Sequence, residues 1–149
     1  MTYATVEPLS WDDIQRDADS LAAQDRVRRQ WSGILAIARG GMIPATLLAH
    51  RLDVRRIDMI SVVTYDDRSI GAPEIMIRPR IEGSGADWLV VDDLVDTGTT
   101  MRIVRAMYPG ITAAVLYTKP KGHALADAFV RSVPQDTWVL FPWDKPAFT

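Results

Sequence analysis

The chain has 149 residues, a formal net charge of −2 and no cysteine. This length is enough for one domain with a hydrophobic core, and the 48 % of apolar and 24 % of charged residues exclude a disordered or fibrous chain. A mildly acidic chain has no general attraction for nucleic acid or anionic membranes, and a chain without cysteine has no disulfide or thiolate metal site.

The N-terminal segment lacks the basic region and the apolar run of a secretory signal. No apolar stretch approaches the roughly 20 residues that a membrane-spanning helix needs. We therefore expect a cytoplasmic protein without an integral membrane segment.

Helical and strand patterns alternate through the first half of the chain. Ser10, followed three residues later by Asp13, predicts the start of a helix whose apolar residues share one face. The continuous apolar run at residues 33–37 is typical of a strand that is buried on both faces. After a break at residues 39–41, a second helix is predicted over residues 44–51, with a proline in its first turn.

The second half of the chain repeats this alternation after one long interruption. Residues 57–63 are predicted to form a strand. The segment 64–86 is rich in glycine, proline and charged residues, and we interpret it as a mobile excursion that can contain a hairpin; such excursions are often lids. Further strands are predicted over residues 88–91 and 112–118, with a helix over residues 101–108 between them. Short strands follow in the tail.

This alternation predicts an α/β fold in one domain over residues 1–149, with a parallel sheet covered by helices on both faces. Ligands of such sheets bind beyond the carboxyl ends of the strands. Three predicted strand ends carry glycine-rich or charged residues: residues 39–41, residues 92–100, and Lys119.

The most informative motif is the string Leu-Val-Val-Asp-Asp-Leu-Val-Asp-Thr-Gly-Thr-Thr at residues 89–100. Between a strand and a helix, such a loop offers backbone N–H groups and hydroxyls to a phosphate, and Gly98 lets the backbone come close to it. Asp92 and Asp93 would repel a bare phosphate. Ribose hydroxyls and Mg²⁺ would separate the like charges, because carboxylates accept hydrogen bonds from a diol and bind Mg²⁺ together with phosphate oxygens. The motif therefore predicts a site for a sugar phosphate.

Plainer interpretations exist for the same residues. The acidic pair could simply end a strand, with Asp96 or Thr97 capping the next helix. A Walker B strand also ends in acids, but the sequence contains no G-x-x-x-x-G-K-[ST] loop. The residues 39–41 could form an ordinary turn, and Lys119 could be a surface lysine.

Residues 90–100 resemble the phosphoribosyl pyrophosphate (PRPP) signature of type I phosphoribosyltransferases. Residues 38–41, Lys119-Pro120, the Pro-Gln-Asp-Thr-Trp string at 134–138 and Pro-Trp-Asp at 142–144 make the chain most similar to the bacterial xanthine-guanine members. The resemblance implies a twisted parallel sheet flanked by helices, with a small hood from the terminal segments and a mobile loop at about 64–86. It implies purine salvage, in which ribose 5-phosphate passes from PRPP to a 6-oxopurine: guanine, xanthine or hypoxanthine, in an order that these residues do not rank.

The resemblance also implies roles for individual residues. The acid that matches Asp96 is the candidate general base, close to a nitrogen of the purine. The loop that matches Arg39 and Gly40 faces the leaving diphosphate, and in relatives it can contain a non-proline cis peptide. The implied PRPP-binding residues are Arg39, Gly40, Gly41, Asp92, Asp93, Asp96, Thr97, Gly98, Thr99 and Thr100. The implied ligands of Mg²⁺ are Asp92, Asp93 and Asp144.

Four residues are implied to bind the purine base. Lys119 would donate to O6 of the ring, which selects 6-oxopurines because the amino group of adenine cannot accept that hydrogen bond. Trp138 would stack on the ring, with a core tryptophan as the plainer interpretation. Val139 would offer backbone groups to the ring edge, and Asp144 would lie near its 2-position or bind metal. Since relatives form homo-oligomers, we expect a homodimer or homotetramer and no nucleic-acid partner.

Some residues depart from the family pattern. Thr64 and Thr99 stand where relatives often have serine and glycine, and the loop 64–86 contains arginine but no lysine, so its contacts with pyrophosphate are not predicted. The alternative from another functional class is a non-catalytic regulator of the same fold that binds PRPP or a nucleotide. The chain has no added domain and no basic excess, which favours the enzyme.

Overall fold

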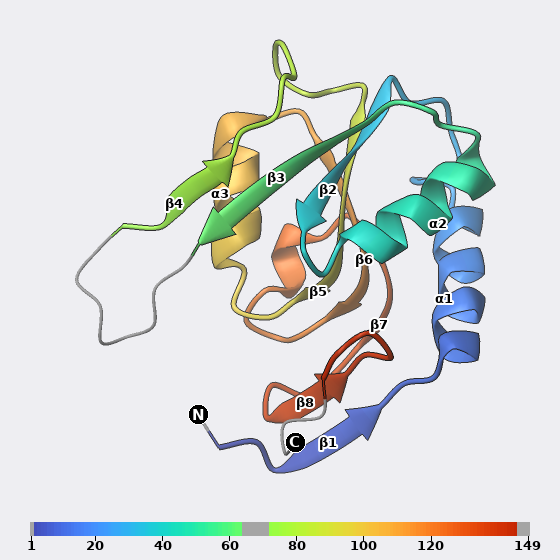
Figure 1. The fold of residues 1–149 in the computed structure, drawn as a ribbon, viewed down its shortest axis with the longest axis vertical. Helices are drawn as coiled ribbons and strands as arrows, with labels where there is room; N and C mark the ends of the chain where they lie inside the picture. The colour runs from blue at the N-terminus through green and yellow to red at the C-terminus, as the bar shows by residue number, and fades with distance from the viewer. Residues whose placement is uncertain (1, 64–71, 146–149) are drawn as a thin grey trace.

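The computed structural model describes residues 2–63 and 72–145. Its centre is a six-stranded sheet in the order β4-β3-β2-β5-β6-β7, seen in Figure 1. All neighbouring strands are parallel except β3 and β4, which agrees with the predicted parallel sheet. The strands are β2 (Gly33–Ala38), β3 (Ile57–Val63), β4 (Glu74–Ile77), β5 (Trp88–Val95), β6 (Thr112–Thr118) and β7 (Ala128–Ser132).

Helices cover both faces of the sheet, as predicted. On one face, α1 (Trp11–Ala23) and α2 (Met42–Leu52) pack against alternate strand residues such as Leu89 and Val91; on the other face, α3 (Thr99–Met107) packs against Val90 and its neighbours. This alternation explains the continuous apolar runs, because successive side chains of a strand point to opposite faces. The helix α1 begins with the expected capping box between Ser10 and Asp13.

The two ends of the chain form a separate small sheet, which is the expected hood. The strand β1 (Thr5–Pro8) pairs in parallel with β8 (Thr137–Leu140). Figure 1 shows this pair below the main sheet, on the side toward which β2 and β3 point. A short 3₁₀ helix, η1 (His123–Leu125), lies between β6 and β7.

The middle strand is longer than its apolar run predicts. We predicted that it would end at residue 91, but β5 continues to Val95, because Asp92, Leu94 and Val95 pair in register with β6. The helix α3 correspondingly starts at Thr99 and not at residue 101. Backbone pairing with a buried neighbour therefore extends the strand past the point where its side chains become charged.

The described part of the long excursion contributes one strand, β4, and not a hairpin of its own, because the partner of β4 is the preceding strand β3. These two strands pair in the antiparallel sense. Residues 64–71, the first part of the expected mobile loop, lie outside the described residues. In the part of the chain that is described, none of the helices is both long enough and apolar enough to cross a membrane.

Candidate active site

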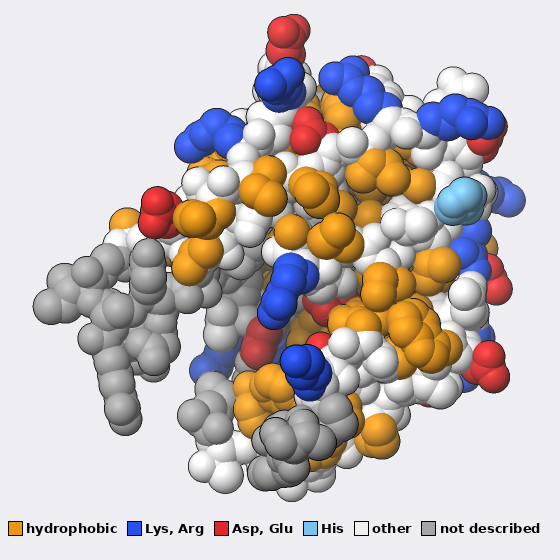
Figure 2. Space-filling view, viewed as in Figure 1, with side chains coloured by type: hydrophobic (Ala, Val, Ile, Leu, Met, Phe, Trp, Pro, Cys, Tyr) orange, Lys and Arg blue, Asp and Glu red, His pale blue; other side chains and the backbone are white. Residues whose placement is uncertain are grey.

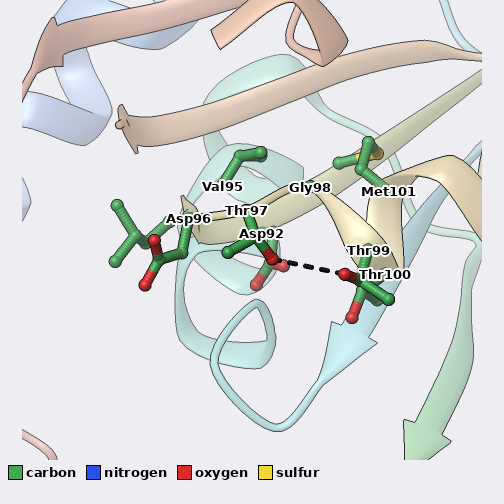
Figure 3. A pocket seen from close by; sticks show the side chains of 9 residues that line it. Asp92, Val95, Asp96, Thr97, Gly98, Thr99, Thr100 and Met101 are labelled. Atoms are coloured by element: carbon green, nitrogen blue, oxygen red, sulfur yellow. Dashed lines mark hydrogen bonds between the residues drawn. The ribbon is translucent and has the colours of Figure 1, made fainter. Parts of the chain in front are cut away.

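The loop from β5 to α3 forms a polar pocket, as the motif predicts. Gly98 occupies the N-cap of α3 with a φ of 89°, and no side chain in the described structure caps this helix. This geometry excludes the plainer interpretation that Asp96 or Thr97 serves as a cap. Figure 3 shows the hydroxyls of Thr97 and Thr99 facing each other, 3.2 Å apart. The pocket is lined by Asp92, Leu94, Val95, Asp96, Thr97, Gly98, Thr99, Thr100 and Met101.

A side chain at position 98 would not fit this loop. The left-handed φ of Gly98 favours glycine, and a β-carbon there would lie 2.3 Å from Leu125 of η1. The N-terminal end of α3 therefore stays open, with hydroxyls beside its first turn. Exposed N–H groups and the helix dipole favour an anion at this position.

Asp92 and Asp93 are half-buried in the second half of β5, and Asp92 lines this pocket. Burial raises the pKa of Asp92 well above its usual value, and the neighbouring charge of Asp93 raises it further. Burial also raises the pKa of Asp93, and Asp144 adds to this rise. Because ionising both carboxylates together is unfavourable, a cation or hydroxyl donors bound next to them would stabilise their charged forms.

The predicted diphosphate loop lies directly against this acidic pair. The peptide bond between Ala38 and Arg39 is cis, as the resemblance allowed, and Arg39 is exposed. A β-carbon on Gly41 would lie 2.3 Å from the carbonyl oxygen of Val91 in β5. The loop after β2 and the end of β5 thus need glycine in order to approach each other.

A second pocket adjoins the first and opens toward the hood. Its lining includes all four residues predicted to bind the base. Leu94 and Asp96 line both pockets, so a ligand that fills both would pass Asp96. Figure 2 shows acidic and basic side chains gathered where the surface is hollowed between the main sheet and the hood. The second pocket is lined by Tyr3, Asp93, Leu94, Asp96, Lys119, Trp138, Val139, Phe141 and Asp144.

Lys119 is a buried lysine and not a surface residue. Its side chain is only 2 % exposed, and its Nζ lies 3.4 Å from Oδ2 of Asp96. The same Nζ donates to the backbone oxygen of Gln135 at 3.4 Å. Buried lysines are rare unless they are paired, and both contacts are long enough for the ammonium to turn toward a ligand in the pocket.

The other residues predicted to bind the base lie in β8 or just after it. Trp138 is 41 % exposed, so it is not the core tryptophan of the plainer interpretation. Asp144 accepts a hydrogen bond from the backbone N of Phe141 at 2.9 Å. Among the described residues, no three or more His, Cys, Asp or Glu side chains are grouped to hold a metal ion, so the metal role of Asp144 stays a prediction.

Two residues of the site have no role in the sequence-based interpretation. Tyr3 reaches the second pocket from the segment before β1, and its ring lies 5.0 Å from that of Trp138 in an edge-to-face arrangement. Gln135 was noted only as part of a motif, but its Nε2 donates to Oδ1 of Asp96 at 2.5 Å. The tyrosine has no local signal, because its place depends on the pairing of strands from the two ends of the chain.

A family model described as the phosphoribosyl transferase domain matches residues 10–147. The chain belongs to this phosphoribosyltransferase family. A xanthine-guanine phosphoribosyltransferase of Nitratidesulfovibrio vulgaris is 42 % identical over 143 residues, which cover 96 % of this chain and 87 % of that protein. One from Chromohalobacter salexigens is 45 % identical over 136 residues, covering 91 % and 82 %.

Solved structures of phosphoribosyltransferases share the fold. A purine phosphoribosyltransferase of Pyrococcus horikoshii superposes with a TM-score of 0.83 at 28 % identity and covers 97 % of both chains. A xanthine-guanine-hypoxanthine phosphoribosyltransferase of Helicobacter pylori gives 0.77 at 26 % identity and covers 93 % of both. These comparisons confirm the family that residues 90–100 suggested and its mostly parallel sheet.

Proposed function

We propose that this phosphoribosyltransferase transfers ribose 5-phosphate from PRPP to a 6-oxopurine, giving the nucleoside 5′-monophosphate and pyrophosphate. The observation that carries the proposal is the junction of two pockets at Asp96. One pocket has the helix N-terminus and hydroxyls that suit a phosphate, and the other has an exposed tryptophan and a buried lysine that suit an oxopurine. Relatives that are 40–45 % identical and named xanthine-guanine phosphoribosyltransferases support the same reaction.

The geometry suggests how the substrates would lie. The 5-phosphate binds the loop 96–100 through backbone N–H groups and the hydroxyls of Thr97, Thr99 and Thr100. The diphosphate lies near Arg39 and Gly40, where a guanidinium stabilises the charge of the leaving group. The ribose then lies beside Asp92 and Asp93, whose carboxylates accept hydrogen bonds from its hydroxyls.

The base would lie in the second pocket. Its ring stacks on Trp138, its edge meets backbone groups of Val139, and O6 accepts a hydrogen bond from Lys119. A ring nitrogen attacks the anomeric carbon as the bond to diphosphate breaks, and the purine proton passes to the carboxylate of Asp96. Nearby carboxylates stabilise the positive charge that develops on the sugar.

The acidic pair fits Mg²⁺. Asp92 and Asp93 supply the carboxylate oxygens that this ion prefers, and burial makes their joint negative charge unfavourable without a cation. When bound together with PRPP, the ion neutralises the charge of the departing diphosphate. We propose Asp92 and Asp93 as its nearest protein groups, with Asp144 as a further candidate at the edge of the base pocket.

Assembly and location belong to the same proposal. We propose one catalytic domain over residues 1–149, working in the cytoplasm as a homodimer or homotetramer. Large apolar side chains are exposed on α2, β3 and β4, which suits an interface between copies. These residues are Met42, Ile57, Val63, Met76 and Ile77.

The test is turnover with purified protein, PRPP and Mg²⁺, offered guanine, xanthine, hypoxanthine or adenine in turn. We expect pyrophosphate release with at least one 6-oxopurine and much less with adenine. Failure with all three 6-oxopurines would reject the proposal. The Asp96→Ala variant separates the enzyme from a PRPP-binding regulator: the turnover of an enzyme should fall sharply, whereas the ligand binding of a regulator, measured by calorimetry, should largely survive.

A further inference from the structure

Gln135 contacts both of the polar side chains that meet the base. It lies between β7 and β8, half-buried. Its side-chain Nε2 donates to Oδ1 of Asp96 at 2.5 Å, and its backbone oxygen accepts from Nζ of Lys119 at 3.4 Å. One residue of the hood thus touches both the candidate proton acceptor and the lysine that would select the base.

The orientation of this glutamine is set by a third contact. Its Oε1 accepts a hydrogen bond from the backbone N of Lys121 at 3.0 Å. Within the side-chain amide, only the oxygen can accept a hydrogen bond from an N–H group. The amide nitrogen must therefore face Asp96. The donor to the carboxylate is therefore held in place by backbone that does not itself contact the substrate pockets.

The two donors to Asp96 differ in what a ligand does to them. Nζ of Lys119 lies 3.4 Å from Oδ2 of Asp96. If O6 of a bound purine accepted a hydrogen bond from this ammonium, Lys119 would turn away from Asp96. Gln135 has no competing hydrogen bond to the base, because its amide oxygen already accepts one from the backbone N of Lys121. When the base is bound, Gln135 is then the donor that keeps the carboxylate, which is 40 % exposed, from rotating toward solvent.

We propose that Gln135 is a positioning residue that acts through Asp96: it fixes the carboxylate at the junction of the sugar and base pockets while Lys119 engages the base. This inference rests on the proposed transferase function. It predicts a change in kcat and little change in KM, because the glutamine side chain touches Asp96 and not the substrates.

Two variants separate positioning from a structural role. Gln135→Ala removes both side-chain contacts, whereas Gln135→Glu keeps an acceptor for Lys121 but places a carboxylate against Asp96 in place of the donor. We expect kcat to fall about 10- to 100-fold in both, as for a lost hydrogen bond to a charged group, with KM for guanine and PRPP within about twofold. Gln30→Glu, at an exposed glutamine before β2, adds the same charge and should match the wild type.

The deciding experiment is a double-mutant cycle with Asp96→Ala, measured in single turnovers. If Gln135 acts through Asp96, then Gln135→Ala should change the rate by less than about twofold in the Asp96→Ala background. The inference would be overturned by any of three results. These are a full additional loss of rate in the Asp96→Ala background, a near wild-type rate for Gln135→Glu, or a rise in KM without a fall in kcat. An inactive wild type would instead reject the transferase function, so the two failures are distinguishable.

Discussion

The carboxylate of Asp93 occupies the space that a side chain at Gly40 would need. A β-carbon built on Gly40 lies 2.4 Å from Oδ2 and 2.6 Å from Cγ of this aspartate. The contact joins the loop after β2 to the end of β5. It places the proposed diphosphate loop directly against the proposed ribose and metal site.

The Gly40→Ala variant should therefore weaken PRPP binding. The added methyl group must displace either the Asp93 carboxylate or the loop that carries Arg39, and both are proposed PRPP contacts. We expect KM for PRPP to rise at least about tenfold, with a smaller change in KM for guanine, measured by steady-state kinetics. Overpacking of this kind also lowers stability, by about 1–3 kcal/mol.

Gly83→Ala provides the matched control. Unlike Gly40, Gly83 has a left-handed φ of 75°, and no atom lies within 4 Å of its added β-carbon. This variant should lose some stability through backbone strain and keep KM for PRPP. An unchanged KM in Gly40→Ala would contradict the proposed place of the diphosphate.

The acidic pair predicts a variant that is more stable but less active. Because burial raises the pKa of Asp92 in the folded protein, its ionisation destabilises the fold as pH rises above about 4. Asp92→Asn removes this charge and keeps an oxygen for the backbone N of Asp93, which Oδ1 of Asp92 accepts at 2.8 Å. We expect Tm of the ligand-free protein at pH 7 to rise by about 3 °C or more.

The same substitution should weaken binding of PRPP in the presence of Mg²⁺, which calorimetry would measure. The stability gain should shrink toward zero as pH falls to about 3, where the aspartate is protonated in both the folded and unfolded states. A lower Tm for Asp92→Asn at pH 7 would show that the ionised Asp92 does not destabilise the folded protein. A gain in Tm that persists at low pH would show the same.

The proposed sugar phosphate half of the site could be predicted from the sequence, and the proposed base half only through family resemblance. Residues 89–100 are contiguous, so strand, loop and helix fix their relative positions locally. The proposed base pocket joins Tyr3, Lys119, Trp138 and Asp144, which come from three separate segments: before β1, after β6, and β8 with the turn that follows it. Their meeting depends on the parallel pairing of β1 with β8, which no local periodicity encodes. The length of β5 was missed for a related reason, because pairing with β6 and not side-chain polarity decides where it ends.

Tyr3 should contribute to base affinity. Its ring lies edge-to-face with Trp138 and 5.1 Å from Nζ of Lys119, so it forms one wall of the base pocket. Loss of such an aromatic contact corresponds to about 0.5–1.5 kcal/mol. We expect Tyr3→Ala to raise KM for guanine about 3- to 10-fold and to leave KM for PRPP unchanged, in steady-state assays with protein free of N-terminal tags.

Two further variants test this assignment. Tyr3→Phe keeps the ring and should behave like the wild type. Val6→Ala alters another exposed side chain of the same terminal segment, 61 % exposed in β1, and should leave both KM values unchanged. Equal effects of Tyr3→Ala and Val6→Ala would indicate that the hood as a whole, and not the tyrosine ring, sets base affinity.

A buried hydrogen bond between β6 and α1 should govern stability and its pH dependence. The hydroxyl of Tyr117, in β6, donates to Oδ2 of Asp17, in α1, and both residues are buried. Tyr117→Phe leaves that carboxylate oxygen without its donor, so we expect a loss of about 1–3 kcal/mol in the free energy of unfolding at pH 7. Tyr108→Phe, also a buried tyrosine but on the opposite face of the sheet, makes the same chemical change away from Asp17 and should cost less.

The sign of the pH effect follows from the pKa of the phenol. Burial, and then the hydrogen bond to Asp17, raise the pKa of Tyr117 in the folded protein, so above about pH 10 the unfolded chain loses this proton first. The wild type should therefore lose stability from pH 10 to 11 more steeply than Tyr117→Phe, as measured by urea unfolding. Parallel stability curves for the two proteins over that range would show that the phenol proton does not support the packing of α1 on β6.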